Sequence, residues 1–234
     1  MNDKMKLISH WLDATGVRGR GVSPVAIEQA LADLLNAISG EQDAVEAGAL
    51  YRYPVPMLSE DGSCSIVDEL SPTPYDLAPI LGGESADTTR KLILLNQLVD
   101  RATGVSGAGW LGIYQSRRNA SGGDVLVKLA YRGRPSRAEF PLTAEFARGS
   151  TNSTVGLSGR AEVIDDVAAH VGAGGGFYVC DAAVQSEACL PILAPAGDRV
   201  LGILDAEAEP KAFFTPERLA VLAAACLMAP SLLP

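Results

Sequence analysis

Histidine is almost missing from this sequence, which holds His10 and His170 among 234 residues. A metal site built mainly from imidazole ligands is therefore excluded. Cysteine is also sparse, and the spacing of its four residues matches no zinc-binding pattern. The chain begins without the apolar segment of a secretory signal peptide. We therefore expect no bound metal, a reducing compartment in which thiols stay free, and a cytoplasmic location.

The sequence also lacks long apolar runs and an excess of positive charge. No segment reaches the roughly 18 consecutive apolar residues that a membrane-spanning helix needs. Lysine and arginine number 19 against 28 acidic residues, which leaves a formal net charge of −9. Nucleic acids and anionic membranes both require clustered cations, so neither is expected as a partner. What the chain does hold is an apolar content of 47%, enough for a packed core.

The first 85 residues are predicted to form an N-terminal extension, in which no chemical motif is visible. Ser23 precedes Pro24 as an N-cap would, and apolar residues recur at helical spacing afterwards, so we predict a helix over 24–39. The rest of the extension is proline-rich and irregular, with short extended pieces over 50–58 and 64–70. We expect the extension to pack on the remainder of the chain or to mediate a homodimer.

Residues 86–234 form the second predicted unit, in which helical and strand-like patterns both occur. The expected elements are a helix over 90–102, strands over 108–115, 125–131 and 137–142, a short helix over 157–163, a strand or loop over 178–182, a hairpin of strands 188–194 and 200–207, and a last helix over 216–228. This order predicts an α+β fold in which helices lie on one face of an antiparallel sheet.

Two short stretches carry most of the chemistry. The first, Cys180-Asp-Ala-Ala-Val-Gln-Ser-Glu-Ala-Cys-Leu-Pro191, places Glu187 seven residues after a thiol. The second, Gly202-Ile-Leu-Asp-Ala-Glu207, places Asp205 and Glu207 on a predicted strand, where side chains two positions apart share a face. One thiol and three carboxyl groups could thus line one pocket, in which burial and proximity raise the pKa of a carboxyl group.

These two stretches resemble the motifs of the free methionine-(R)-sulfoxide reductases, which are GAF-domain proteins. The resemblance runs from about residue 89 to residue 227. It includes Gly109-Trp-Leu-Gly-Ile-Tyr114, Arg132-Gly-Arg-Pro135, Gly156-Leu-Ser-Gly159 and Phe214-Thr-Pro-Glu217. It implies a GAF-like fold for residues 86–234. It also implies an enzyme that reduces the R epimer of free methionine sulfoxide, with no metal and no bound organic cofactor.

The resemblance further implies a role for the thiol and the three acids. Cys180 is the nucleophile that attacks the sulfoxide sulfur and becomes a sulfenic acid; the alternative is a packed thiol without reactivity. Glu187, Asp205 and Glu207 bind the amino group and the sulfoxide end of the substrate. One of them, with a raised pKa, would protonate the leaving oxygen.

Two aromatic residues and an external reductant complete the expected enzyme. Trp110 and Tyr114 match the aromatic wall around the methyl group of the substrate, and the alternative is that they are plain core aromatics. They lie four positions apart, so on one strand they share a face. The expected electron donor is a dithiol protein such as thioredoxin.

The sequence departs from the family at two cysteine positions, where it has Ser158 and Arg137. The family's first cysteine, which resolves the oxidised nucleophile, is thereby lost. Cys189 and Cys64 are candidate resolving thiols if their sulfurs can approach Cys180 within disulfide geometry. The alternative for Cys189 is a core thiol.

The missing cysteines and the long extension keep a second class of function open. In that alternative the chain is a non-enzymatic GAF module that binds a small molecule or senses oxidation through Cys180. The retained thiol and acids favour the enzyme, and a turnover assay separates the two.

Overall fold

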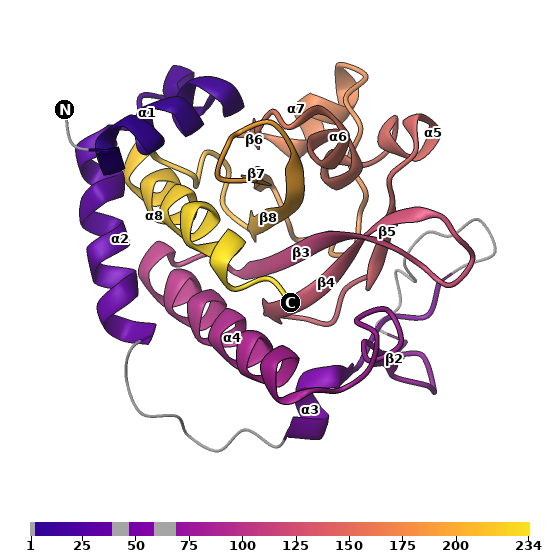
Figure 1. Cartoon of the computed structure of the whole chain (residues 1–234). Helices are drawn as coiled ribbons and strands as arrows, with labels where there is room; N and C mark the ends of the chain where they lie inside the picture. The colour runs from indigo at the N-terminus through magenta and orange to yellow at the C-terminus, as the bar shows by residue number, and fades with distance from the viewer. Residues whose placement is uncertain (1–2, 39–46, 59–68) are drawn as a thin grey trace.

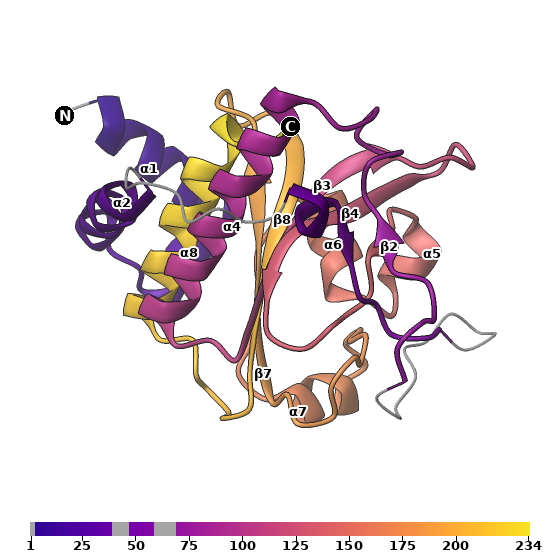
Figure 2. The ribbon, with the colours of Figure 1, turned by 90° about the horizontal axis from the view of Figure 1, so that it is seen from below.

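The computed structural model describes residues 3–38, 47–58 and 69–234, which are arranged in three layers (Figure 1). A six-stranded sheet forms the middle layer. Figure 2 shows the long helices on one face of this sheet and the shorter helices on the other. The predicted α+β fold with a flanked antiparallel sheet is confirmed, whereas the prediction that helices cover one face is wrong.

The six strands of the main sheet come from the second half of the chain. They are β3 (Trp110–Arg118), β4 (Asp124–Arg132), β5 (Glu139–Pro141), β6 (Glu162–Ile164), β7 (Ser186–Leu193) and β8 (Val200–Ala208). Their order across the sheet is β5-β4-β3-β8-β7-β6, and all neighbours are antiparallel. The predicted hairpin is confirmed as β7–β8. The central pair β3–β8 brings distant parts of the sequence side by side.

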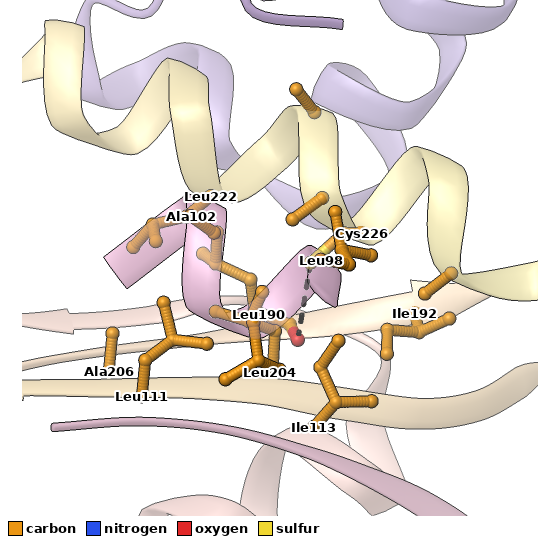
Figure 3. Close-up of a cluster of buried hydrophobic side chains, with 14 of the residues drawn as sticks. Leu98, Ala102, Leu111, Ile113, Leu190, Ile192, Leu204, Ala206, Leu222 and Cys226 are labelled. Carbon is orange, nitrogen blue, oxygen red and sulfur yellow. Dashed lines mark hydrogen bonds between the residues drawn. The ribbon is translucent and has the colours of Figure 1, made fainter. Parts of the chain in front are cut away.

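Four helices cover one side of the sheet, which we call the apolar face. They are α4 (Ala86–Ser106) and α8 (Pro216–Met228) against the strands, with α1 (Asp3–Thr15) and α2 (Pro24–Ile38) outside them. The strand side chains of the apolar face are Leu111, Ile113, Leu190, Ile192, Leu204 and Ala206, and they lie beneath these helices in Figure 3. Burying each larger side chain contributes on the order of 1.5–3 kcal/mol, so this layer holds the main core.

The caps of α4 and α8 explain where these helices begin. The Ser85 side chain accepts a hydrogen bond from the Thr88 backbone N–H, so α4 starts one turn earlier than predicted. The helix ends at Gly107, whose φ of 73° is the left-handed conformation that glycine favours. Thr215 caps α8 and a proline occupies its first turn, as the sequence predicts.

Three short helices cover the opposite side, which we call the mixed face. They are α5 (Ala144–Ala147), α6 (Thr151–Ser158) and α7 (Val167–Gly172). All eight residues of β7 are buried, because this strand is covered on both sides.

The predicted helix over 157–163 is wrong. Helix α6 begins after Ser150, whose side chain accepts a hydrogen bond from the Ser153 N–H, and it ends at Gly159. Residues 162–164 form β6 instead. The Thr, Asn and Ser residues of α6 have low helix propensity, so packing against the sheet decides this helix.

The N-terminal extension packs on the rest of the chain, which was one of the two alternatives expected from the sequence. It holds η1 (Val17–Arg20), α3 (Ala47–Tyr51) and a two-stranded sheet of β1 (Arg52–Tyr53) and β2 (Tyr75–Asp76), in addition to α1 and α2. Helix α2 confirms the predicted helix, and α1 was not predicted. The extended piece over 50–58 is replaced in part by α3, and residues 64–68 lie outside the described ranges.

None of the helices within the described ranges is long and apolar enough to cross a membrane.

Candidate active site

A small cavity opens on the mixed face between the sheet and α6. Its walls come from β3, β7, β8, α6, the β4–β5 connection and the loop between α7 and β7. The lining residues are Trp110, Tyr114, Ser136, Phe140, Ser150, Thr151, Asn152, Tyr178, Cys180, Glu187, Asp205 and Glu207. The structure thus brings together all six residues that the sequence predicted for catalysis and substrate binding.

Strand pairing is what assembles the three acids. Glu187 on β7 lies directly opposite Glu207 on β8, which in turn lies opposite Trp110 on β3. Asp205 is two positions before Glu207, so both side chains point to the mixed face. Directly paired positions have Cβ atoms about 4.5–5.5 Å apart, which makes the convergence of the carboxyl groups a result of register alone.

Trp110 lies flat against the sheet because two glycines leave room for it. A Cβ atom on Gly112 would stand 2.4 Å from the indole ring, and a Cβ atom on Gly133 would stand 2.6 Å from it. Gly133 also has a φ of 111°, which disfavours other residues. The indole Nε1 donates a hydrogen bond of 2.9 Å to the Arg134 carbonyl oxygen. These contacts hold the indole in place as one wall of the cavity.

The polar wall contributed by α6 escaped the sequence analysis. Asn152 accepts a hydrogen bond of 3.4 Å from the Cys189 thiol and is hydrogen-bonded to Asp205, while Thr151 is hydrogen-bonded to Glu187. Ser136, Phe140, Ser150 and Tyr178 are the other lining residues that were missed. The cap at Ser150 was the available signal, since it places the following polar residues on the first turn of a helix.

Burial and like charge change the ionisation of the acids. Burial raises the pKa of Glu187 well above its ordinary value, and the nearby Asp205 and Glu207 add to the increase. Burial also raises the pKa of Asp205 to about 6, against hydrogen bonds from Asn152 and Glu187 that favour its charged form. Burial thus favours the protonated form of Glu187 over its charged form, and the two carboxyl groups share a hydrogen bond. One oxygen of each carboxyl group, Glu187 Oε2 and Asp205 Oδ1, has no hydrogen-bond partner.

Cys180 is half-buried in the loop before β7, at the edge of the cavity. The alternative of a short strand over 178–182 is wrong, because these residues form no strand. Asp181 makes an ion pair of 3.4 Å with Arg134 from the β4–β5 connection. On the other side of the thiol, Tyr178 accepts a hydrogen bond of 2.9 Å from Arg137 Nη1. The residues around Cys180 are thus held at two points.

The cavity is small. For the centre of a water molecule it offers about 10 Å³, which is room for about one water. A neighbouring hollow of about 330 Å³ has Trp110, Ser136, Cys180 and Glu207 in its wall as well. Pockets for small ligands usually measure about 300–1,000 Å³. A ligand in this hollow would contact Cys180 and Glu207 directly, whereas access to Glu187 and Asp205 requires the small cavity to widen.

Neither the two other described cysteines nor Ser158 lines the cavity. Cys189 is fully buried on β7 beside Asn152, and burial raises the pKa of its thiol well above the ordinary value. Cys226 packs on the apolar face, where its thiol donates a long hydrogen bond of 3.9 Å to the Leu190 carbonyl (Figure 3). Ser158 ends α6 outside the lining, and Cys64 is outside the described residues. Among the residues described, no group of three His, Cys, Asp or Glu side chains is arranged to hold a metal.

Comparison with known proteins now places the fold. A family model for the GAF domain matches residues 92–229. The chain belongs to the GAF domain family. The match covers the main sheet, α4 through α8 and every acid of the cavity, and it leaves the N-terminal extension outside. No protein with a curated description matches this GAF protein.

Solved structures similar to this GAF domain include two reductases and one domain of another enzyme. The type II free methionine-R-sulfoxide reductase from Thermoplasma acidophilum is 18% identical, with a TM-score of 0.53 over 62% of this chain and 94% of that one. The free methionine-R-sulfoxide reductase from Neisseria meningitidis is 23% identical, with a TM-score of 0.49 over 61% and 78%. The GAF domain of an Acinetobacter phosphoenolpyruvate-protein phosphotransferase is 13% identical, with a TM-score of 0.47 over 61% and 80%. At these identities the likeness concerns the fold.

Proposed function

We propose that this protein reduces the R epimer of free methionine sulfoxide by thiol chemistry at Cys180. One observation carries the proposal: a thiol and three carboxyl groups converge on one cavity, and burial raises the pKa of one of these carboxyl groups, Glu187, well above its ordinary value. The resemblance of the motifs around Cys180 and Glu207 supports it, and so does the reductase activity named for the similar Thermoplasma acidophilum protein.

The reaction transfers the sulfoxide oxygen to the protein. The Cys180 sulfur attacks the sulfur of the substrate and forms a bond to it; the protonated oxygen then passes from the substrate sulfur to the Cys180 sulfur, and the sulfur–sulfur bond breaks. Methionine leaves, and Cys180 becomes a sulfenic acid that carries the oxygen. Burial raises the pKa of Glu187 and favours its protonated form, so it is the group placed to protonate the sulfoxide oxygen as negative charge develops there.

The remaining acids select the amino acid by charge. Asp205 and Glu207 present negative charge to the cavity, where an ammonium group replaces the water that burial removes from them. An indole against one wall offers apolar surface for the methyl group and a π face for a positively polarised sulfur. A free amino acid offers this ammonium group, whereas a methionine sulfoxide within a peptide does not.

Regeneration of Cys180 needs electrons from outside the protein. A dithiol of the thioredoxin class attacks the sulfenic acid, releases water and leaves as a disulfide, so that two electrons return Cys180 to the thiol. Arg137 stands where the resemblance puts the resolving cysteine, and its guanidinium packs on Phe146 and Tyr178. Cys189 is protonated and fully buried, which makes it a poor attacking thiol. We therefore assign the resolving step to the external thiol.

A turnover assay tests the proposal. The protein is given a mixture of the two epimers of free methionine sulfoxide with dithiothreitol, and methionine and both residual epimers are quantified by chromatography. We expect consumption of the R epimer, loss of turnover in Cys180→Ser, and retained turnover in Cys226→Ala, a buried thiol on the opposite face. Absence of turnover at every substrate and reductant concentration would overturn the proposal.

A non-enzymatic GAF module is the second candidate, and the small volume of the cavity together with Arg137 and Ser158 at the two cysteine positions favours it. In this case the acids bind an amine without reaction. Calorimetry that shows binding of methionine sulfoxide, together with no methionine produced, would select this candidate.

A further inference from the structure

A buried lysine lies beside the cavity, and the proposed function does not use it. Lys128 on β4 has no exposed surface. Its Nζ lies 4.1 Å from the ring centroid of Tyr131, 5.2 Å from that of Tyr53 and 5.9 Å from that of Trp110. A buried ammonium group is costly unless its hydrogen bonds are satisfied, and the faces of three aromatic rings offset part of this cost. The Lys128 amine therefore lies in the interior, facing three aromatic rings.

Lys128 makes two short hydrogen bonds to one residue of the cavity wall. Its Nζ donates to the carbonyl oxygen of Ser136 at 2.7 Å and to the Oγ of Ser136 at 2.8 Å. Bonds of this kind, with an ionised donor, are stronger than neutral ones. Because the Ser136 oxygen accepts from the ammonium group, the hydroxyl proton of Ser136 must point elsewhere.

Ser136 and Tyr114 line the same cavity. The Ser136 side chain is hydrogen-bonded to the Tyr114 phenol, while burial raises the pKa of that phenol. If Ser136 donates in this bond, the phenol proton can turn toward the cavity, whose wall also holds Cys180 and Asp205. Each hydrogen bond in such a chain polarises the next.

We propose that Lys128, Ser136 and Tyr114 form a donor relay, in which Lys128 is a positioning residue and Tyr114 donates a hydrogen bond to the sulfoxide oxygen of the substrate. The relay rests on the proposed function. It assigns Tyr114 the role of a hydrogen-bond donor in addition to that of an aromatic wall. The cavity makes the donor necessary, because its carboxyl groups attract an ammonium group and repel an oxygen. With Glu187, Tyr114 gives that oxygen a second donor.

The relay also connects the N-terminal extension to the site. Tyr53 of β1 supplies one of the rings around Lys128, and its hydroxyl donates a hydrogen bond of 2.7 Å to the Lys128 carbonyl oxygen. The extension thereby covers the outer side of the lysine. Replacing Tyr53 by Leu should weaken the relay in the same direction as replacing Lys128.

The test compares two ligands that differ by one oxygen. Affinities for methionine-(R)-sulfoxide and for methionine are measured by calorimetry in a Cys180→Ser background, which prevents turnover. The preference for the sulfoxide should fall about three- to tenfold in Tyr114→Phe, Ser136→Ala and Lys128→Met, which is the range for one lost hydrogen bond. Methionine itself should bind as before. Ser136→Thr, which retains a hydroxyl, should restore most of the preference.

A matched control is Ser106→Ala, which removes a buried hydroxyl of α4 far from the cavity and should leave the preference unchanged. Circular dichroism checks the fold of each variant. If Lys128→Met does not fold, Ser136→Ala and Ser136→Thr decide. A preference that responds to Tyr114→Phe alone would overturn the relay and leave Tyr114 as an isolated donor.

Relay and function can fail separately. If the wild type turns over the sulfoxide and the relay variants behave like Ser106→Ala, the relay is wrong and the proposed function stands. If the wild type neither turns over nor binds the sulfoxide, the proposed function and the relay are both wrong.

Discussion

The two faces of the central sheet are built from the same strands but hold different kinds of side chain. On the apolar face, Leu204 and Ala206 of β8 belong to the main hydrophobic core beneath α4 and α8. On the mixed face, the alternate residues Asp205 and Glu207 of the same strand meet aromatic rings and α6. The main hydrophobic core lies on one face, and the buried acids lie on the other, where their desolvation has a cost in stability.

This difference follows from the period of a strand. Because successive side chains point to opposite faces, alternate residues of a single strand can belong to a hydrophobic core and to a polar cavity. The mixed face holds a buried lysine and two buried acids, whose desolvation the apolar core must offset. Substitutions on the mixed face should therefore change activity most, and substitutions on the apolar face should change the free energy of unfolding most. Four substitutions test this difference, in order of decreasing expected effect.

Glu187→Gln should lower kcat by about 10²- to 10⁴-fold, which is the usual contribution of a general acid. Glutamine keeps the shape and one hydrogen-bond donor but holds no proton that the sulfoxide oxygen can take. Steady-state kinetics with dithiothreitol measure the effect, with thermal unfolding as the control for the fold. An unchanged kcat would show that another group protonates the oxygen.

Leu204→Ala should lower the free energy of unfolding by about 2–5 kcal/mol, since it leaves a cavity under α8 on the apolar face. The folded fraction should keep a kcat within about twofold of the wild type, because the next residue along still points to the mixed face. Chemical denaturation and kinetics at low temperature measure the two quantities. A large loss of kcat in fully folded protein would contradict the separation of the faces.

Asp205→Asn should stabilise the protein by about 1–3 kcal/mol near pH 7.5 while weakening ligand binding. The folded-state pKa of Asp205 is raised to about 6 from an ordinary value of 3.8. Its contribution to stability is thus complete below about pH 4 and is lost as the pH rises to about 6, a loss on the order of 3 kcal/mol. Denaturation midpoints of both proteins from pH 4 to 8 should diverge with rising pH. Parallel curves would show that this carboxyl group is not strained by burial.

Gly112→Ala should destabilise the protein by about 1–3 kcal/mol, because the added methyl group meets the Trp110 ring and overpacks the wall. Displacement of the indole should also raise the KM for the sulfoxide. Gly104→Ala is the matched control in α4: no atom lies within 4 Å of its added Cβ, so it should stabilise by about 0.5–1 kcal/mol. Equal effects of the two substitutions on KM would mean that the indole does not shape the cavity.

Local sequence signals determined much of the fold. Helical spacing with a proline start predicted α2 and α8, and alternation with turn residues predicted β3, β4 and the β7–β8 hairpin. The signals failed where packing outweighs propensity. Helix α6 is rich in Thr, Ser and Asn, and α1 shows no cap that sequence reasoning used, so tertiary contacts decide both.

The sequence by itself determined which chemical groups are available: a thiol, three acids and two aromatics at spacings that share strand faces. The tertiary structure alone decided which of them meet and in what state. Strand register sets Glu187 opposite Glu207, and burial then raises the pKa of Glu187. The wall from α6, the Lys128–Ser136–Tyr114 contacts and the Cys180 loop at the edge of the cavity join segments far apart in the chain. Distance and desolvation set these properties, and neither is encoded in the neighbours of a residue along the sequence.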